Sequence, residues 1–272
     1  METAIEVKDL IIEIQTAIDK VASIKTKEQQ EKYMKEQEKY RGVKSPGVNE
    51  IFKHFWREKI KDLSIAAKKS IAHQLLSEEY SEDKYIGALI FEKIQKEITL
   101  EDIKKIEKLF VKGEIHWWAN CDLICGKILK PFHRGNKKNT EYIASWKDSK
   151  CLWLQRASCV AFVNLAKKGD KENFKGFIDI LIEICKSTIK NPERFVQLGT
   201  GWLLREIGVY NKKLLTNFIE EHIEHFSREG LRYAIEKLSS AEQKKMTNLI
   251  IKPNIAEIEE ETNNQPKKKK KK

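Results

Sequence analysis

The fold of this chain is decided by residues 116–129, which read HWWANCDLICGKIL. Read as a helix, the stretch carries one apolar stripe, made of Trp117, Cys121, Ile124 and Ile128. Trp118 and Asp122 are four residues apart on the neighbouring face, with Gly126 one turn further along. Because a carboxylate is seldom placed among bulky apolar groups without a partner, this pair marks either tight packing or a chemical site.

The composition of the whole chain also favours helices. The 272 residues are 40% hydrophobic and 34% charged, which is typical of a soluble protein with much exposed helix surface. Only 12 glycines and 5 prolines are present, so turns are few and a sheet-rich fold is disfavoured. The sequence therefore predicts an all-α fold.

Amphipathic segments follow one another along most of the chain. Helical periodicity is found at about residues 5–22, 46–58, 61–76, 82–96, 100–111, 117–129, 139–149, 151–168, 173–188, 193–208, 212–222, 227–238 and 241–250. Most connections have about two to six residues, which places successive helices antiparallel, and a basic loop is expected at about 131–139. Helix pairs that recur every ~35–45 residues predict an α-solenoid of HEAT-like repeats, and a non-repeating helical bundle is the alternative.

The apolar periodicity ends at Pro253. Residues 253–272 are rich in glutamate and then end in six lysines, a composition that cannot bury enough apolar surface to fold. We therefore expect a repeat domain at residues 1–252 and a disordered acidic-then-polylysine tail at residues 253–272. The lysine run could be a nuclear address, a phosphate anchor or a low-complexity end without a dedicated task.

The net charge of the chain is +11. Seven lysines at 252 and 267–272, offset by four glutamates at 257–261, account for three of these charges and leave +8 for residues 1–251. A body charge of this size favours a polyanionic partner, most simply nucleic acid, although a merely soluble basic protein remains the alternative.

Five cysteines, at positions 121, 125, 151, 159 and 185, lie inside apolar helical patterns. An odd number in this setting predicts reduced thiols of an intracellular protein, and their spacing does not suit zinc. The acidic N-terminus is unlike a signal peptide, and no apolar run approaches the ~20 residues of a membrane span. We expect no membrane partner and a location in the cytoplasm or nucleoid, or in the nucleus.

Three later helices each carry a conspicuous pair of side chains. The pairs are Trp153 with Arg156, Trp202 with Arg205, and Arg228 with Arg232. Gly199 and Gly201 precede Trp202 and allow another backbone to approach closely. If these helices are equivalent members of a solenoid, their side chains line one concave, aromatic and basic groove around the carboxylate of Asp122.

Each of these residues also has a simpler explanation. Tryptophans at helical spacing usually belong to the core, and Trp117 is the clearest example in this chain. Arg205 with Glu206 can be a surface ion pair of little energetic value. Asp122 can pair with an arginine such as Arg156. The combination of residues favours a site more than any one of them does.

The combined motifs resemble the DNA alkylation repair glycosylases of the AlkD type. The resemblance rests on five blocks, in the family's order: Gly42-Val43-x-x-Pro46, Trp117-Trp118-x-x-x-Asp122, Trp153-x-x-Arg156, Gly201-Trp202-x-Leu204-Arg205-Glu206, and Arg228-x-x-x-Arg232-Tyr233-Ala234. It covers roughly residues 5–250. The family is built of HEAT-like repeats, in agreement with the periodicity.

The resemblance implies a monofunctional enzyme that hydrolyses the N-glycosidic bond of N3- and N7-alkylated purines in duplex DNA, without full base flipping. It implies that Asp122 is the catalytic carboxylate and that Trp118 and Trp202 contact the sugar of the lesion. The expected contacts to the DNA backbone are Arg156, Arg205, Arg228 and Arg232. The residue types suit this chemistry, since a carboxylate stabilises an oxocarbenium-like sugar and arginines hold phosphates.

No metal or cofactor motif is present, and no lysine stands out as a Schiff-base nucleophile, so we expect neither a cofactor nor lyase activity. The expected partner is duplex DNA containing alkylated bases, bound by a monomer. The sequence departs from the family at Ala119, where many relatives carry another acidic residue, and in a longer interval between Arg156 and Trp202. Two alternatives are a non-catalytic protein that binds DNA structures and a protein-binding solenoid scaffold, but the presence of Asp122 favours the enzyme.

Overall fold

The structure, a computed structural model, describes residues 4–249 of the chain. Within these residues there is no β-strand, only a single bridge between Lys39 and Tyr80. The all-α prediction is confirmed. The expected tail at 253–272, and the last residues of the expected domain at 1–252, lie outside the described residues.

The first half of the chain forms seven α-helices. These are α1 (Ala4–Val21), α2 (Ile24–Tyr33), α3 (Ser45–Phe55), α4 (Ile65–Ser77), α5 (Ser81–Lys93), α6 (Leu100–Val111) and α7 (Trp118–Ile124). Six of them coincide with the periodic segments of the sequence. The helix α2 was not predicted, because it has no buried residue and therefore no apolar stripe.

The second half continues in the same manner. Its helices are α8 (Lys130–His133), α9 (Lys137–Ser145), α10 (Leu152–Val160), α11 (Val163–Ala166), α12 (Phe177–Thr188), α13 (Arg194–Tyr210), α14 (Lys212–His222) and α15 (Arg228–Ala234). Residues 240–249 are also helical. No helix in the described part of the chain is long and apolar enough to cross a membrane.

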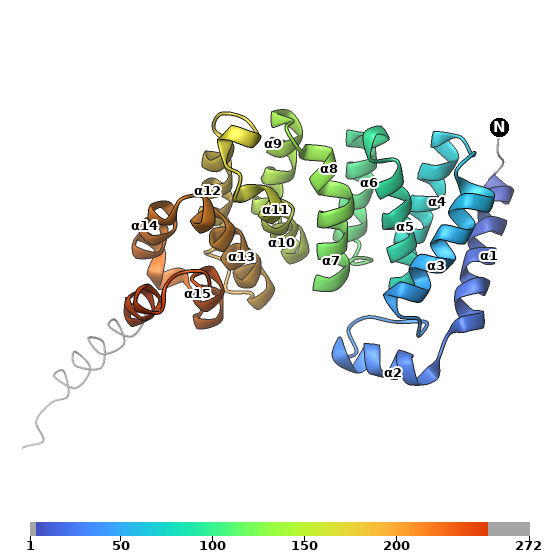
Figure 1. The fold of residues 1–272 in the computed structure, drawn as a ribbon, viewed down its shortest axis with the longest axis horizontal. Coiled ribbons are helices and arrows are strands. Elements are labelled where there is room, and N and C mark those ends of the chain that lie inside the picture. The colour runs from blue at the N-terminus through green and yellow to red at the C-terminus, as the bar shows by residue number, and fades with distance from the viewer. Residues whose placement is uncertain (1–3, 250–272) are drawn as a thin grey trace, which may run out of the picture.

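The helices are stacked along one axis, and each contacts mainly its near neighbours in the chain. One continuous row runs α3, α5, α7, α10, α13, α15, each helix contacting the next. Other helices pack behind this row, for example α4 against α5 and α12 against α13. Figure 1 shows the resulting elongated stack, bent so that its lower edge is concave between α2 and α15. This is the arrangement of an α-solenoid.

The helix that contains the opening stretch of sequence is interrupted where it was expected to be continuous. After α7 the chain widens into a π-helical turn, Cys125–Leu129, before α8 begins. Pro131 explains the change, because its ring would clash with the carbonyl of Lys127 in a regular α-helix and it has no N–H to donate. The expected loop at 131–139 is accordingly shorter, and α9 already begins at Lys137.

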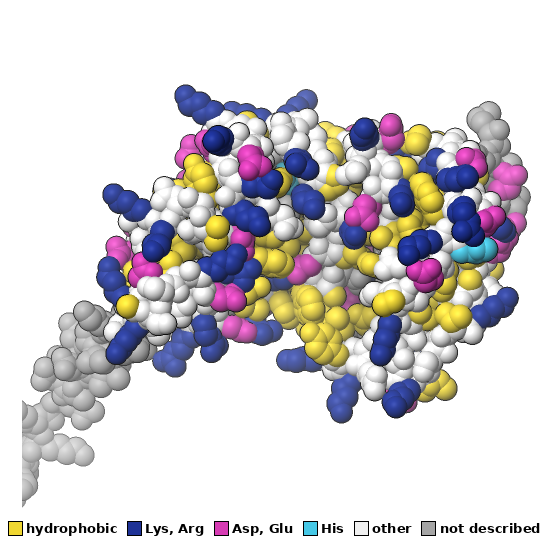
Figure 2. Space-filling view, viewed as in Figure 1, with side chains coloured by type: hydrophobic (Ala, Val, Ile, Leu, Met, Phe, Trp, Pro, Cys, Tyr) yellow, Lys and Arg dark blue, Asp and Glu magenta, His cyan; other side chains and the backbone are white. Residues whose placement is uncertain are grey.

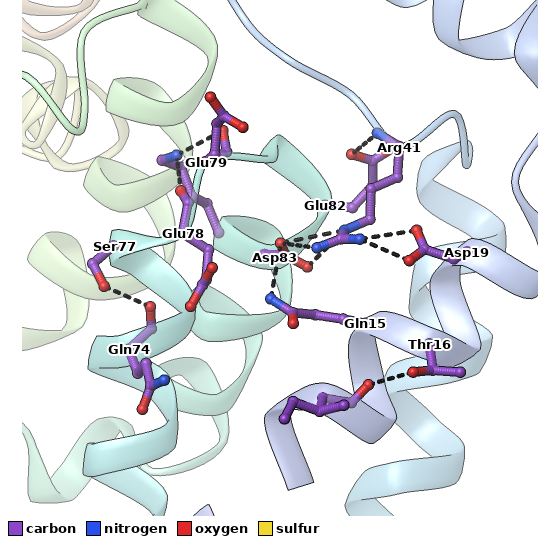
Figure 3. Close-up of polar contacts among 12 residues, drawn as sticks. Gln15, Thr16, Asp19, Arg41, Gln74, Ser77, Glu78, Glu79, Glu82 and Asp83 are labelled. Carbon is purple, nitrogen blue, oxygen red and sulfur yellow. Dashed lines mark hydrogen bonds and ion pairs between the residues drawn. The ribbon is translucent and has the colours of Figure 1, made fainter. Parts of the chain in front are cut away.

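A strap of residues 34–44 connects α2 to α3 and is held by the first turn of α5 (Figure 3). The carboxylate of Glu82 accepts hydrogen bonds from the backbone N–H groups of Arg41, Gly42 and Val43, with N···O distances of 2.9, 2.9 and 3.0 Å. Gly42 has φ +105°, and a Cβ there would lie 2.4 Å from a backbone oxygen, so only glycine fits. The Gly42-Val43 block of the sequence thus has a structural role in shaping the strap.

A buried ion pair completes this attachment. Arg41 donates from Nε and Nη2 to the carboxylate of Asp83, and the closest contact is 2.8 Å. The Asp83 side chain is fully buried, and the second partner of Arg41, Asp19, is exposed. The strap is therefore fixed to the solenoid by a carboxylate that has lost its contact with solvent.

Replacing Arg41 by Ala should lower the free energy of unfolding by about 3–5 kcal/mol, because it leaves the buried Asp83 carboxylate without its counter-charge. Urea unfolding of the purified protein measures this difference. Arg57→Ala is the matched control, since Arg57 is exposed and its one ion pair within residues 4–249 is with its neighbour Glu58; its loss should change stability by less than about 0.5 kcal/mol. Equal effects of the two changes would show that the Arg41–Asp83 ion pair does not hold the strap in place.

Candidate functional site

Asp122 and Arg156 form a close, two-point ion pair between α7 and α10. Nε and Nη2 of Arg156 donate to the two carboxylate oxygens of Asp122 at 2.9 and 2.8 Å. Nη1 of the same guanidinium donates to the carbonyl oxygen of Phe195 at 2.9 Å, on α13. Arg156 thus joins three successive helices of the row, and it fixes the orientation of the Asp122 carboxylate.

The pair is buried unequally. The Asp122 side chain is 20% exposed, whereas that of Arg156 is 7% exposed, so the carboxylate keeps an open side and the guanidinium does not. Burial raises the pKa of the Asp122 carboxyl above its ordinary value, and Arg156 opposes the rise. Burial acts to lower the pKa of Arg156, but Asp122 outweighs it and the pKa is raised. The site therefore holds a permanently charged guanidinium behind a partly accessible carboxylate.

Aromatic rings surround the back of this ion pair. Trp117 packs against Phe195 and Trp153 with ring centroids 4.9 and 5.9 Å apart, and Trp153 lies 5.3 Å from Phe195. Trp117 was expected within the helix and in the core, but it lies in extended backbone just before α7 and is partly buried against the core, as Trp118 is. Its Nε1 is buried and has no hydrogen-bond partner among residues 4–249. The guanidinium of Arg156 lies 6.0 Å from the ring centroid of Phe195, so this aromatic cluster adjoins the ion pair.

Trp118 and Trp202 lie within helices of the row, whereas Trp117 precedes α7. Trp118 is the first residue of α7, one turn before Asp122, and Trp202 is on α13; both are partly buried against the core. Because α7, α10 and α13 are consecutive in the row, the structure brings Trp118, Asp122, Arg156 and Trp202 onto neighbouring helices. In Figure 2, hydrophobic side chains gather near the lower end of α7, where the surface is hollowed, with Lys and Arg side chains on both sides.

The arginines expected to contact DNA fall into two groups. Arg228 and Arg232 are exposed on α15, and neither forms an ion pair within the described chain. Arg205 is largely buried and already paired with the carboxylates of Glu206 and Glu236, and its guanidinium lies 4.9 Å from the ring centroid of Tyr233. The ion pair of Arg205 with Glu206 that the sequence suggested is present, but it is largely buried and not on the surface.

Arg156 also departs from its expected environment. All three of its donor nitrogens point at Asp122 or at Phe195, so the guanidinium is used inside the protein rather than presented to a phosphate. The sequence offered this alternative, a pairing of Asp122 with Arg156, and the structure contains it. Phe195 was missed, since an aromatic residue in the first turn of a helix gives no sign of its carbonyl's role.

Two glycines of α13 allow the row to close around this site. The position of a Cβ on Gly199 would lie 3.4 Å from Cγ of Arg156, and one on Gly201 would lie 2.6 Å from the carbonyl oxygen of Gly230, on α15. The sequence predicted a close backbone approach at these glycines; this is confirmed at Gly201, whereas a Cβ on Gly199 would meet Arg156 only at ordinary van der Waals distances. Gly199 thus leaves room for the Arg156 stem, and Gly201 sets the distance between α13 and α15.

Gly201→Ala should therefore destabilise the protein by about 1–3 kcal/mol, because the added methyl overlaps the Gly230 backbone and forces α15 away. Thermal or urea unfolding measures the change. At Gly126, nothing described lies within 4 Å of the added Cβ, so Gly126→Ala should leave stability unchanged or increase it by roughly 0.4–1 kcal/mol. A Gly201→Ala protein as stable as the wild type would show that the α13–α15 contact is looser than described.

The described residues contain no cluster of three or more His, Cys, Asp or Glu side chains suited to a metal ion. A partly exposed carboxylate, oriented by a buried guanidinium, can stabilise a positive charge that develops on a bound molecule.

Comparison with known proteins gives two findings. The family described as DNA alkylation repair enzyme matches residues 14–238. A solved structure of a protein from Enterococcus faecalis, described as a predicted DNA alkylation repair enzyme, is similar with a TM-score of 0.69 and 16% sequence identity. The match covers 80% of this chain and 97% of that chain, and at this identity it concerns the fold. No curated protein matches the sequence.

Proposed function

The chain belongs to the DNA alkylation repair enzyme family, and from this we propose that it is a monofunctional DNA glycosylase that removes N3- and N7-alkylated purines from duplex DNA. The observation that carries the proposal is the Asp122 carboxylate, which is oriented by Arg156 and open on one side. The enzyme acts as a monomer and leaves an abasic site.

The reaction needs little more than stabilisation of charge. An alkylated purine is already cationic and leaves readily, and its departure builds positive charge on the sugar. A carboxylate close to C1′ stabilises this charge and can orient the attacking water on the same sugar. Because Arg156 holds Asp122 from behind, the carboxylate needs no reorganisation when the charge develops.

The remaining residues hold the DNA. Trp118 and Trp202 present ring faces that favour a cationic sugar or base by ~0.5–2 kcal/mol each. Arg228 and Arg232, which are exposed and without ion pairs in the described structure, contact the backbone phosphates. These contacts bind sugar and phosphate without reading the sequence, and the lesion need not be fully flipped out of the duplex. Arg156 is a positioning residue for Asp122, and Arg205 joins α13 to Tyr233 of α15 and to Glu236 in the turn that follows α15.

The test is release of 7-methylguanine and 3-methyladenine from methylated duplex DNA, measured by chromatography of the free bases. The proposal predicts release of both bases by the wild-type protein and none from unmethylated DNA. A protein that binds methylated DNA but never releases a base would instead be a non-catalytic member of the family.

The pH dependence of base release should reflect Asp122. Only the ionised carboxylate stabilises a cationic sugar, so the rate should fall as pH decreases through the pKa of Asp122. Because burial raises this pKa, the decrease should begin at a higher pH than the ordinary aspartate pKa of about 3.9 would give. Single-turnover rates over a pH series check this. A rate that stays constant down to the ordinary aspartate pKa would contradict the assignment.

A further inference from the structure

A cavity of about 320 Å³ lies at the upper edge of the stack in Figure 1, where α3 and α5 end and α4 begins. It is lined by Trp56, just after α3, by Ile65 and Lys68 of α4, and by residues 93–97. Its volume is within the roughly 300–1,000 Å³ of pockets that bind small molecules. Neither the proposed reaction nor any residue named for it uses this space.

The cavity is remote from the candidate site. The helices α3 and α5 both begin at the strap, and Asn120 of α7 donates to Ser81, the first residue of α5, at 3.1 Å. The start of α7, with Asp122, therefore lies at the strap end of the stack, whereas the cavity lies at the other end of α5. With a rise of about 1.5 Å per residue, the 13 residues of α5 separate the two ends by about 20 Å. A molecule in this cavity is thus a second ligand, distinct from the lesion at Asp122.

Lys68 places a buried charge in the wall of this cavity. The residue is 8% exposed, and in the described part of the chain its ammonium group contacts the Trp56 ring but has no ion pair and no hydrogen-bond acceptor. Lys84, the other buried lysine among the described residues, instead donates to the carbonyl oxygens of Glu78 and Glu79. Lysine is seldom buried without a partner, because its charged group loses hydration. The ammonium group of Lys68 therefore lacks an acceptor that a ligand in the cavity can supply.

Two further lysines give the cavity a positive charge. Lys93, the last residue of α5, and Lys96 are exposed, and neither forms an ion pair with another described residue. Glu97 is the one carboxylate among the described residues that line the cavity, so three lysines face one glutamate, a balance of +2. This charge favours an anion, and lysines bind phosphate as point charges.

Trp56 gives the cavity an aromatic surface. Its ring packs against Phe52 of α3 with centroids 5.9 Å apart, and the residue is only partly buried. The ammonium groups of Lys68 and Lys93 lie 5.8 and 6.0 Å from the centroid of the same ring. An aromatic surface beside two ammonium groups suits a ligand that carries a flat ring next to an anion.

We propose that this cavity binds a nucleoside phosphate. The base stacks on the indole of Trp56, the phosphate accepts hydrogen bonds from Lys68 and Lys93, and the amide of Gln95 meets the polar edge of the base. The ligand is either a free nucleotide or one nucleotide of a single-stranded nucleic acid, because both present the same ring and the same phosphate. The site goes beyond the glycosylase function and does not depend on it.

The chain has only six tryptophans, so the site can be observed directly by NMR. The full-length protein is labelled with ¹⁵N in its tryptophan indoles, and the Trp56 signal is assigned as the one that is lost in Trp56→Phe. Deoxyadenosine 5′-monophosphate should shift the Trp56 signal in a saturable way. Deoxyadenosine, which lacks the phosphate, should bind at least about tenfold more weakly, because Lys68 and Lys93 then have no anion to contact.

Lys68→Met separates loss of the site from loss of the fold. Methionine keeps an unbranched side chain and removes a buried charge that has no counter-charge in the described structure, so the free energy of unfolding should stay the same or increase. Nucleotide binding at Trp56 should weaken at least about tenfold. Lys245→Met is the matched control, an exposed lysine paired with Glu220 near the other end of the stack, and it should bind like the wild type. Lys93→Met changes an exposed lysine of the same cavity and should also weaken binding, which serves if Lys68→Met is unstable.

A single-stranded octamer of deoxyadenylate distinguishes the two sources of the ligand. If the site takes one nucleotide of a strand, the octamer shifts the Trp56 signal at a concentration at least about tenfold lower than the mononucleotide does, because its other phosphates add attraction to the basic chain. If the site takes a free nucleotide, the octamer binds no more tightly than the mononucleotide.

Three results would overturn the proposal. They are a Trp56 signal that neither the mononucleotide nor the octamer shifts, an unchanged affinity in folded Lys68→Met, and an equal loss of affinity in Lys245→Met. Base release from methylated duplex DNA should be the same in Lys68→Met and Lys245→Met, because the cavity is remote from Asp122. A loss of base release in Lys68→Met alone would show that the cavity belongs to the substrate groove and would also overturn the proposal.

Discussion

Asp122→Asn is expected to lower the single-turnover rate of 7-methylguanine release by about 10²–10³-fold or more. The substitution removes the negative charge that stabilises the developing cation on the sugar, and the neutral amide cannot replace it. DNA affinity should remain the same or increase slightly, because a negative charge disappears from a surface that faces phosphates. Quantifying free base after a single turnover, together with DNA binding by fluorescence anisotropy, separates the two effects.

This variant also removes the counter-charge of the buried Arg156, so its fold must be verified by its unfolding temperature. Asp102→Asn is a suitable control, because Asp102 is a buried carboxylate on α6, paired with Lys69 at 2.6 Å and with His73. It should lose stability but retain full base release below its unfolding temperature. If Asp122→Asn were as active as Asp102→Asn, Asp122 would not be the catalytic group.

The second large effect is expected for Arg156→Met. The change leaves the Asp122 carboxylate without its buried partner and should cost about 3–5 kcal/mol of stability. It should also slow base release strongly, because the carboxylate loses its fixed orientation. Urea unfolding and single-turnover rates, both measured at a temperature where the variant is folded, give the two quantities.

The pH profile distinguishes positioning from a purely structural role of Arg156. Arg156 opposes the rise in the pKa of Asp122, so its removal should raise that pKa further and move the acidic decrease in rate to higher pH. Arg156→Lys keeps a positive charge and should show a smaller shift, although it loses the two-point contact. An Arg156→Met profile that coincides with that of the wild type would mean that Arg156 only stabilises the fold.

Much of the fold could be predicted from the sequence, because apolar periodicity reports which residues are buried. The helices from α3 to α7 and from α9 to α14 correspond to periodic segments, and their order places Asp122 and Trp202 on one row. Two features could not be predicted in this way. The helix α2 buries no side chain, and the π-helical turn at Cys125–Leu129 depends on how Pro131 is accommodated.

The sequence predicted which residues belong to the candidate site, but not which of them contact one another. Spacing alone placed Trp118 and Asp122 on one helix face, whereas the contact between Asp122 and Arg156 joins residues 34 positions apart. The same holds for Arg205, whose partner Glu236 lies 31 positions further on, in the turn after α15. Residue type alone suggested that Arg156 and Arg205 bind phosphate. Their packing shows that both already form ion pairs with carboxylates of the protein. The exposed Arg228 and Arg232 remain predicted phosphate contacts.

The proposed function is tested most directly by measuring the release of free 7-methylguanine from methylated duplex DNA by excess wild-type protein. We expect an exponential release of base that leaves abasic sites, with no strand cleavage until alkali is added, and no release from unmethylated DNA. Methylated DNA that is bound by the protein while every methylated base stays attached would contradict the central role given to Asp122.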